Sequence, residues 1–302
     1  MRARWADLAT LAALTALLAG CSSGGGAPHP SPSSTGSPSS GSTAKPKILV
    51  GARARDITFA QMNSEIGPVR ATRVFYTKLP ASFDTTMFPR DVKVIVSYKD
   101  PSANTAAYVR SIPADANVEM AFHHEPEGLK DFPGPPNVAG PRFVKAFTTQ
   151  AQLIRAANPK IRVAFIGGSY QYRPTGGRGI GGFFIPSTAD DYYLDSYQRI
   201  RIIPAAEDPR IQNFIAELTK KDLSFNGFTE YGRGLTPPGA PSSAAEAAAR
   251  AKVIATDAAW LQAQPKVNLW IYWYTPALAS GAQWRFTDPA SVKAWRAQSS
   301  AR

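Results

Sequence analysis

Cysteine is almost absent from this chain of 302 residues, in which Cys21 is the only one. A single cysteine excludes an intrachain disulfide, so a folded domain must be held together by burial of an apolar core. Histidine is also scarce, with three residues in all. Two of them, His123 and His124, are neighbours and would point to opposite faces of a regular strand, which is poor geometry for sharing a metal. We therefore expect neither a metal site nor another cofactor.

Several other signals are missing. After the N-terminal segment, no apolar run is long enough to span a membrane. The chain carries a net charge of +12, yet no basic run or nucleic-acid-binding motif accompanies that charge. We therefore expect no nucleic-acid partner, and interpret the charge as a basic surface facing an anionic envelope. The glycine pattern at Gly177–Gly182 does not directly follow a strand, so it does not predict a dinucleotide site.

The N-terminal segment predicts export. Arg2 and Arg4 precede an apolar run at Leu8–Leu18, which is the pattern of a signal peptide over residues 1–20. The residues leading to Cys21 resemble a bacterial lipobox, which implies that Cys21 is the lipidated residue. We expect an extracytoplasmic protein anchored in the membrane by its lipid. The alternative is simple secretion with an incidental cysteine.

Residues 21–46 consist almost entirely of Ser, Gly, Pro, Thr and Ala after the cysteine. Such a segment has too little apolar surface to offset the entropy of ordering, so we expect a disordered tether. Residues 47–302 contain no second linker of this kind. Their length suits one α/β domain, because about 250 residues is typical of a (β/α)8 (TIM) barrel.

Short apolar runs alternate with helical patterns through residues 47–302, which predicts a parallel α/β architecture. Several runs are almost continuously apolar, as expected for strands covered by helices. The predicted strands are Ile48–Gly51, Thr72–Tyr76, Val92–Tyr98, Val118–His123, Ile161–Ile166, Tyr192–Leu194, Phe225–Thr229 and Val267–Tyr274.

Helix signals fill most of the gaps between these strands. Asp56 is the expected cap of a helix that ends at Ile66, and Asp208-Pro209 and Asp288-Pro289 are expected to begin two others. Helices are also predicted from Phe143 to Ala157 and, behind a capping box of Ser243 and Glu246, up to Leu261. Only Gly167–Ala189 offers no good helix, so we expect a long loop there.

Two glutamates follow apolar strands at the position where barrels carry their functional residues. Glu125 lies in the segment His123-His124-Glu125-Pro126, and Glu230 in Phe228-Thr229-Glu230-Tyr231-Gly232. On the predicted strand count, Glu125 ends the fourth strand and Glu230 the seventh, across the barrel from each other. Each alone could be an ordinary solvated acid at a strand end. Together they could flank one bond, as glycoside hydrolysis requires.

The arrangement resembles clan A of the glycoside hydrolases, in which the acid/base follows strand four and the nucleophile strand seven. His124-Glu125 and Phe228–Gly232 are similar to the corresponding segments of glycoside hydrolase family 26, the family of many β-mannanases. The resemblance implies a retaining hydrolase of β-glycosidic bonds in a polysaccharide. It assigns Glu125 as acid/base, Glu230 as nucleophile and His124 as a hydrogen-bonding partner in the site.

Weaker similarities extend to strands six and eight. The segment Asp191–Tyr197 makes Asp195 a candidate ligand of a sugar hydroxyl and Tyr197 a candidate partner that holds Glu230. Trp270-Ile271-Tyr272-Trp273 resembles the strand whose tryptophan lines the sugar site, and Trp273 is nearer the strand end. Packing in the core is the alternative for each tryptophan.

The chain also departs from the family pattern. Pro126-Glu127-Gly128 follows Glu125, where the mannanases carry an aromatic-rich continuation, and few residues remain for extra substrate-binding loops. Two other functions stay open. One is a carbohydrate-binding or scaffold lipoprotein that keeps the barrel without its chemistry. The other is a transglycosylase that acts on envelope glycans with the same two acids.

Overall fold

The computed structural model describes most of the chain after residue 46. The predicted signal peptide 1–20, Cys21 and the tether 21–46 lie outside the described residues, as does most of the glycine pattern at Gly177–Gly182. The described residues are 47–101, 104–128, 132–175, 181–199, 202–235, 243–276 and 283–300.

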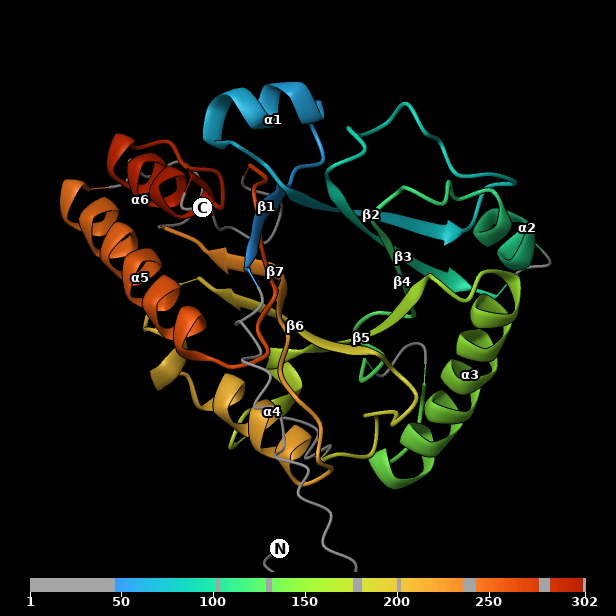
Figure 1. Ribbon diagram of the computed structural model, residues 1–302. Helices are drawn as coiled ribbons and strands as arrows, with labels where there is room; N and C mark the ends of the chain where they lie inside the picture. Colours follow the sequence, from blue (N-terminus) through green and yellow to red (C-terminus); the bar gives the residue numbers. More distant parts are fainter. Residues whose placement is uncertain are drawn as a thin grey trace, which may run out of the picture. The chain divides into compact units, whose positions relative to one another are not determined.

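The described residues form a (β/α)8 barrel, which confirms the predicted fold. Every neighbouring pair of strands in the sheet is parallel, in the order β1-β8-β7-β6-β5-β4-β3-β2. The strands surround a central axis, with helices on the outside (Figure 1). They are β1 (Leu49–Arg53), β2 (Ala71–Lys78), β3 (Lys93–Asp100), β4 (Val118–Phe122), β5 (Arg162–Gly168), β6 (Asp191–Gln198), β7 (Gly227–Arg233) and β8 (Leu269–Trp273).

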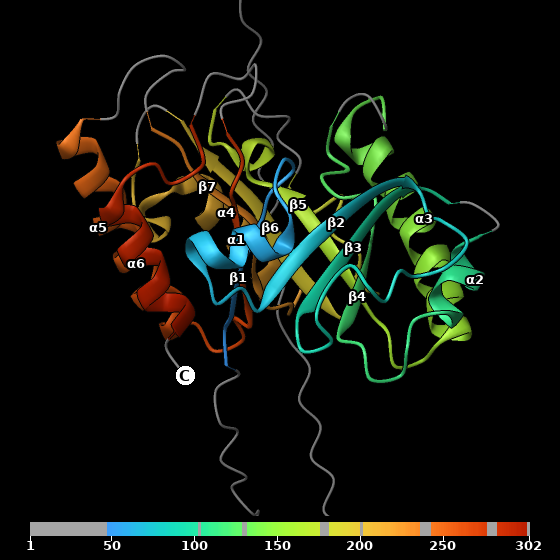
Figure 2. The same ribbon diagram turned by 90° about the horizontal axis from the view of Figure 1, so that it is seen from above.

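The barrel closes between β1 and β2. The backbone amide of Arg70 donates to the carbonyl of Val50 at 3.0 Å, and the hydroxyl of Thr72 donates to the carbonyl of Ala52 at 2.8 Å. Gly51 permits this approach, because a Cβ at this position would lie 1.8 Å from the carbonyl oxygen of Ala71. Figure 2, seen from above, shows β2 and β3 running obliquely across the barrel, as closure of a sheet requires.

Strand alternation divides the core into two parts. Residues that face the barrel axis form a small apolar layer that includes Ala71, Ile95, Ile166 and Ile271. Residues on the opposite strand faces, such as Val96, pack with the helices into a much larger cluster. The inner apolar layer is thin, so the two ends of the barrel interior are left to polar side chains.

The helices cover the outside of the barrel. Capping boxes and proline starts hold the first turns of several of them, including the predicted box of Ser243 and Glu246 and the predicted cap Asp208. The α-helices are α1 (Phe59–Ile66), α2 (Asn104–Arg110), α3 (Pro136–Ala157), α4 (Pro209–Thr219), α5 (Ala244–Ala263) and α6 (Pro289–Ser300). Two short 3-10 helices, η1 (Ser169–Tyr172) and η2 (Ala205–Glu207), lie before and after β6.

Three local expectations need correction. Thr58, not Asp56, caps α1 through a reciprocal pair of hydrogen bonds with Gln61, whereas Asp56 pairs with Arg285. Helix α2 was not expected, and α3 begins at Pro136, before the predicted start. The expected lack of an α-helix between β5 and β6 is confirmed for the residues described there.

A polar group fills the end of the barrel interior at which the strands begin. Lys93 lies 2.7 Å from Glu119, whose carboxylate also accepts a hydrogen bond from the hydroxyl of Tyr193. Nearby, Arg162 pairs with Asp191 at 2.7 Å. These side chains neutralise one another, so this end serves packing and closure of the barrel.

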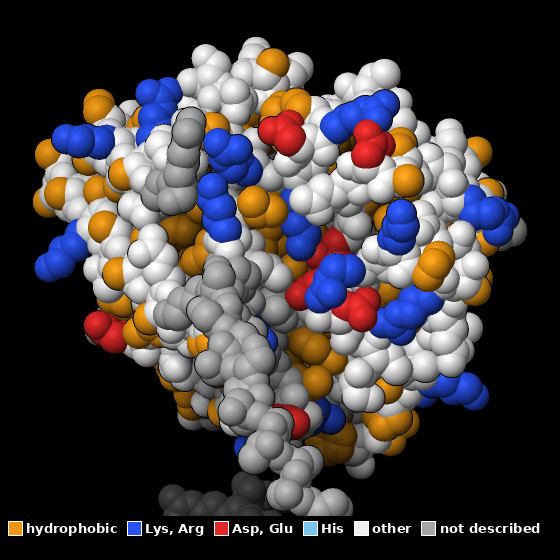
Figure 3. Space-filling model, in the orientation of Figure 1, with side chains coloured by type: hydrophobic (Ala, Val, Ile, Leu, Met, Phe, Trp, Pro, Cys, Tyr) orange, Lys and Arg blue, Asp and Glu red, His pale blue; other side chains and the backbone are white. Residues whose placement is uncertain are grey.

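Opposite charges also alternate on the outside of the protein. On the face seen in Figure 3, Lys and Arg side chains surround the rim and a mixed group of acidic and basic side chains lies near the centre. That face shows no continuous basic stripe of the kind that tracks a phosphate backbone. Among the described residues, no helix combines the length and apolar character needed to cross a membrane.

Candidate active site

Arg73 lies at the centre of the site. It belongs to β2, faces the barrel axis and is fully buried. Its Nη1 donates to both carboxylate oxygens of Asp195 at 2.9 Å and lies 3.4 Å from Oε1 of Glu230. Its Nε donates to the hydroxyl of Ser97 at 2.8 Å. Arg73 therefore connects β2, β3, β6 and β7 inside the barrel.

A β-bulge positions Glu230. Leu194 and Asp195 are consecutive in β6, yet they pair with Phe228 and Glu230, so Thr229 is an extra residue in β7. A bulge re-aims the side chains beside it. Here it lets two consecutive residues face the axis, because the Thr229 hydroxyl donates to Asp195 at 2.6 Å while Glu230 lies beside Arg73.

Glycine at the start of β7 makes this arrangement possible. Gly227 has a φ of +126°, and a Cβ there would lie 1.9 Å from the carbonyl oxygen of Leu269. No other residue type fits that contact. The strand then continues to Arg233, past the end predicted from the sequence.

Glu125 lies in a strained turn after β4. His123 and Glu125 have φ values of +53° and +50°, which residues other than glycine seldom adopt and which cluster at functional sites. Backbone hydrogen bonds hold the turn, because the amide of His123 donates to Tyr98 at 2.7 Å and that of Glu125 to Ile166 at 2.9 Å. The turn is thus fixed to both neighbouring strands.

The structure brings the two predicted catalytic glutamates to the same end of the barrel. The Glu125 side chain lies against Gly168, where an added Cβ would be 3.2 Å from its Oε1. Gly168 pairs with Asp195, and Asp195 pairs with Glu230. Two strand spacings of about 4.8 Å each thus separate Gly168 from Glu230. Two glutamate side chains can bridge that interval.

Burial and mutual repulsion dominate the electrostatics of these acids. Burial and the charge of Asp195 together raise the pKa of Glu125 to about 7, against the opposing charges of Arg73 and Lys99. Burial, Asp195 and Glu125 also raise the pKa of Glu230, against the opposing charges of Arg73 and Arg53. The two glutamates therefore sense each other's charge. A pair of acids with shifted pKa values at one end of a barrel is typical of an active site.

Asp195 supports Arg73 and is not placed as a free sugar ligand. It is 1 % exposed, and both of its oxygens accept hydrogen bonds from Arg73. Burial raises the pKa of Asp195, although Arg73 and the hydroxyl of Thr229 lower it. To bind a sugar hydroxyl, as predicted from the sequence, Asp195 would have to share oxygens that already accept hydrogen bonds from Arg73 and Thr229.

His124 and Trp273 lie in an aromatic group beside the acids, together with Phe75 and Tyr197. The Phe75 ring meets the edge of His124 at 5.2 Å and that of Trp273 at 6.3 Å between ring centroids. Burial lowers the pKa of His124 well below its ordinary value, so its ring is neutral and can accept or donate a hydrogen bond. Trp273 is 5 % exposed, and the Arg55 guanidinium lies over its ring at 5.0 Å.

Tyr197 has different neighbours from those expected. Its ring lies 6.2 Å from Trp273 and 5.6 Å from Trp284 between centroids, and Gly232 leaves room for it. Among the described residues, no hydrogen bond joins Tyr197 to Glu230. The charged group beside Glu230 is Arg73 of β2. The contact with Glu230 that was predicted for Tyr197 is thus made by Arg73.

Glu127 is a further acid near the site. It is fully buried, and its carboxylate accepts hydrogen bonds from the amide of Gly168 at 3.3 Å and the hydroxyl of Tyr172 at 3.4 Å. Burial raises its pKa to about 8, and the charge of Glu125 adds to the rise. Glu127 thus supports the turn that carries Glu125.

Sequence reasoning missed Arg73, Glu127 and Arg53. A signal for Arg73 was present, because it is a charged residue inside the apolar run of a predicted inner strand. Such a residue either ends the strand or faces a polar barrel interior. Glu127 carried no comparable signal, since an acid directly after a strand-ending proline is ordinary in a solvated loop.

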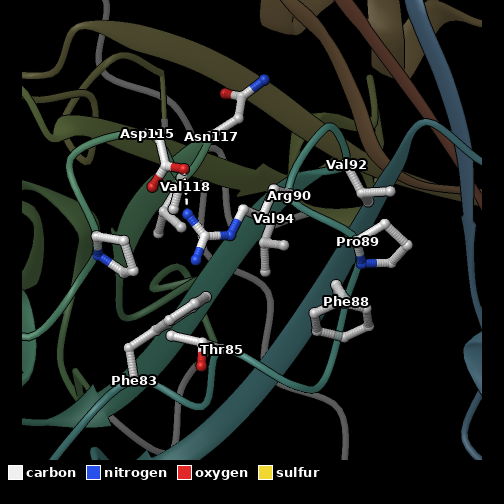
Figure 4. Close-up of a pocket in the computed structure, with 12 residues that line it drawn as sticks. Phe83, Thr85, Phe88, Pro89, Arg90, Val92, Val94, Asp115, Asn117 and Val118 are labelled. Carbon is white, nitrogen blue, oxygen red and sulfur yellow. Dashed lines mark hydrogen bonds and ion pairs between the residues drawn. The ribbon is translucent and has the colours of Figure 1, made fainter.

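A separate pocket lies away from these acids. The pocket lies between the segment that contains Phe83 and Phe88 and the starts of β3 and β4 (Figure 4). Val94 of β3 is one of the residues that line it. Arg90 and Asp115 form an ion pair at this pocket. No residue of the acid group described above lines it. Among the described residues, no group of three or more His, Cys, Asp and Glu side chains could hold a metal ion.

Comparison with known proteins gives similarity of structure only. No protein-family model matches the chain, and no curated protein matches its sequence. A glucosidase from Croceicoccus marinus is similar over 85 % of this chain and 68 % of its own, with 12 % identity and a TM-score of 0.51. An endo-β-1,4-glucanase from Xanthomonas axonopodis pv. citri is similar over 84 % of this chain and 100 % of its own, with 11 % identity and a TM-score of 0.50.

A third similar structure belongs to a larger protein. The chain covers 76 % of its own length but 30 % of a β-glucuronidase from Bacteroides uniformis, with 10 % identity and a TM-score of 0.52. At such identities the similarity establishes the barrel fold and no more. These three solved structures are nevertheless all of glycosidases built on such a barrel.

Proposed function

We propose that this protein is a retaining glycoside hydrolase that cleaves β-glycosidic bonds of a polysaccharide. One observation carries the proposal: Glu125 follows β4 and lies against Gly168, Glu230 lies in β7, and Asp195 pairs with both Gly168 and Glu230, so the two acids meet at one end of the barrel. Glycoside hydrolysis requires two such acids on either side of one bond. The barrels of the similar solved structures support this reading of the fold.

The two acids divide the reaction between them. Glu125 has its pKa raised to about 7 and is therefore protonated below that pH, as an acid that protonates the departing oxygen must be. Glu230 attacks the anomeric carbon and forms a covalent glycosyl-enzyme while the glycosidic bond breaks. Glu125 then removes a proton from water, which attacks the same carbon and releases Glu230.

Arg73 favours the ionised form of the nucleophile. Its charge, together with that of Arg53, opposes the effect of burial on Glu230. Because Asp195 and Ser97 fix the guanidinium from two sides, its charge is kept 3.4 Å from Oε1 of Glu230. A charge that is already in place beside the nucleophile needs no reorganisation during the reaction.

The decisive experiment is a panel of β-linked polysaccharides scored for released reducing sugars. The wild type is compared with Glu125→Gln and Glu230→Gln, and Glu207→Gln in the exposed helix η2 is the matched control. We expect the control to keep full activity and each catalytic variant to lose at least about a thousandfold in kcat, a typical cost of removing such a group. Activity in both catalytic variants would refute the assignment.

Two further measurements separate this function from its rivals. Binding of a glycan without release of product would assign the barrel as a carbohydrate-binding or scaffold protein. Longer products in the presence of an added acceptor sugar would assign a transglycosylase. NMR of the first product formed tests retention, because a covalent intermediate returns the β-anomer.

We also propose that the enzyme acts outside the cytoplasm while it is attached to the membrane by a lipid on Cys21. The proposal rests on the signal-peptide and lipobox pattern of residues 1–21. Metabolic labelling with an alkyne fatty acid is expected to label the wild type and not Cys21→Ala. A wild type that remains unlabelled would favour simple secretion.

A further inference from the structure

Two arginines, one at the end of β1 and one just after it, lie beside the predicted catalytic acids. Arg53 is the last residue of β1 and pairs in register with Trp273, and its guanidinium lies 5.5 Å from the centroid of the Phe75 ring. Arg55 follows two residues later, is exposed, and lies over the ring of Trp273. Both guanidinium groups therefore border the aromatic group next to Glu230.

The partly buried Arg53 and the exposed Arg55 lack the carboxylate partners that the fully buried arginines have. Arg73 pairs with Asp195, Arg233 with Asp257 and Arg250 with Asp288. In the described part of the chain, no carboxylate lies within ion-pair distance of Arg53 or Arg55. The Nε atom of Arg53 is buried and has no hydrogen-bond partner there. A buried donor without a partner is costly and calls for an explanation.

Repulsion adds to this cost. Burial lowers the pKa of Arg53, Glu230 opposes that effect, and the charges of Arg55 and Arg73 lower the pKa further. Three guanidinium groups are thus held close enough to repel one another. Evolution seldom retains such an arrangement for folding alone, and structures that break local rules do so mainly at functional sites.

The acids nearby do not balance this charge at neutral pH. Asp195 and Glu230 together face Arg73. Burial raises the pKa values of Glu125 and Glu127 to about 7 and about 8, so these two contribute less than their full negative charge. The three guanidinium groups of Arg53, Arg55 and Arg73 therefore carry more positive charge than these acids offset at the place where a substrate would lie.

We propose that Arg53 and Arg55 bind an anionic substituent of the sugar chain, so that the substrate is an acidic polysaccharide that carries carboxylate or sulfate groups. The inference rests on the proposed hydrolase function and names its substrate class. A guanidinium group is a planar fork that binds either anion through two parallel hydrogen bonds. The Trp273 ring holds the guanidinium of Arg55 through its face, which leaves the N–H edge available to a ligand.

A narrower role for Arg53 must be separated from this one. Its charge also lowers the pKa of Glu230, so a variant at position 53 would affect catalysis on any substrate. The charges that lower the pKa of Glu230 come mainly from Arg73 and Arg53, and not from Arg55. Arg55 is therefore the residue whose loss should affect substrate choice without a general loss of kcat.

The experiment compares an acidic polysaccharide with its own carboxyl-reduced form, which has the same backbone and linkages but no charge. Wild type, Arg55→Gln and Arg53→Gln are assayed, with Arg110→Gln, the exposed last residue of α2, as the matched control of charge. We expect the wild type to prefer the acidic polymer. Arg55→Gln should raise KM for that polymer by roughly 10- to 100-fold, the equivalent of one charged hydrogen-bonded contact. The KM for the reduced polymer should not change.

Three outcomes would overturn the inference. One is equal kcat/KM of the wild type on the acidic and reduced polymers. Another is an Arg55→Gln variant that behaves like Arg110→Gln. A third is an acidic-polymer preference that persists undiminished in 0.5 M salt, since screening at roughly that ionic strength weakens exposed charge contacts. Sulfated and carboxylated forms of one backbone, assayed side by side, distinguish the two anions.

Failure of the inference and failure of the hydrolase function give different results. Hydrolysis of neutral glycans alone would keep the hydrolase and overturn the anion site. If no glycan is hydrolysed, the hydrolase function fails, and calorimetry with the acidic polymer decides the rest. Binding that is lost in Arg55→Gln and kept in Arg110→Gln would support the anion site, and no binding would refute it.

Discussion

Arg73 reaches both carboxylate oxygens of Asp195 from a single nitrogen, Nη1, at 2.9 Å each. The same nitrogen is the one nearest to Glu230. The position and charge of the proposed nucleophile are therefore linked to an ion pair that is completely buried between β2 and β6. Buried pairs of this kind contribute little net stability, but they are costly to break from one side only.

The first prediction concerns the cost of removing only one partner of this buried pair. Arg73→Met leaves Asp195 buried without its cation and Glu230 with only the charge of Arg53 opposite it, so we expect the variant to lower the free energy of unfolding by about 3–5 kcal/mol. The double variant Arg73→Met/Asp195→Asn removes one of the stranded charges and should recover part of that loss. Denaturant unfolding at pH 7 measures both. A single variant as stable as the wild type would contradict the pairing.

The second prediction is a pH profile of kcat/KM. Glu125 must carry its proton in the free enzyme, and burial raises its pKa to about 7. We therefore expect kcat/KM to decline above pH 7, by up to about tenfold per pH unit. A substrate whose leaving group needs no proton should lose this alkaline decline in its first step. A profile that already declines from pH 5 upward would refute the role of Glu125.

The third prediction concerns stability and Glu127. Its pKa is raised from 4.5 to about 8 in the folded protein, so between these values the unfolded chain gives up a proton that the folded one keeps. Folding is then disfavoured as the pH rises. This group should lower the free energy of unfolding by up to about 1.4 kcal/mol per pH unit in that window.

Unfolding of wild type and Glu127→Gln across pH 4.5 to 8 tests this slope. The variant should be less dependent on pH than the wild type, with the largest difference at the alkaline end. Glu207→Gln serves as a control, since its side chain is exposed. Parallel curves for wild type and Glu127→Gln would mean that Glu127 is ionised in the folded state.

The fourth prediction compares two glycines. Gly227 and Gly134 both have positive φ values, +126° and +109°, but only Gly227 faces backbone atoms within contact distance. Gly134→Ala should cost about 1 kcal/mol for the backbone strain alone. Gly227→Ala should cost several times more, because its Cβ collides with the carbonyl of Leu269. Equal losses in thermal unfolding would show that β7 can shift to accommodate a side chain.

Much of the barrel could be predicted because nearly every strand is a short, almost continuously apolar run. The eight apolar runs predicted from the sequence correspond to the eight strands, and strand β6 is longer than the three residues expected. Its polar residues hid it, since Asp191 and Asp195 interrupt the apolar pattern. Both face the barrel interior at its polar ends, where buried charges are neutralised by Arg162 and Arg73.

The site was predictable in part. The segments around Glu125 and Glu230 indicated two strand ends, and the structure brings them to one end of the barrel. The role of Arg73 could not be derived, because its carboxylate partners Asp195 and Glu230 lie more than 100 positions away in the chain. Long-range pairing of charges leaves no periodic signal in a sequence. The capping of α1 by Thr58 shows the same difficulty at short range, since Asp56 two residues earlier is an equally acceptable cap residue.

The extra residue in β7 has a consequence for how this strand can vary. Phe228 faces the helices and Glu230 the axis, which is already the alternation of an unbroken strand once Thr229 is taken away. Removing Thr229 would thus leave every other side chain of β7 on its present face. The barrel does not need this residue to close, and what it contributes is one hydroxyl group directed at Asp195. The strand is one residue longer than its architecture demands, and the extra residue contacts the buried pair of Arg73 and Asp195.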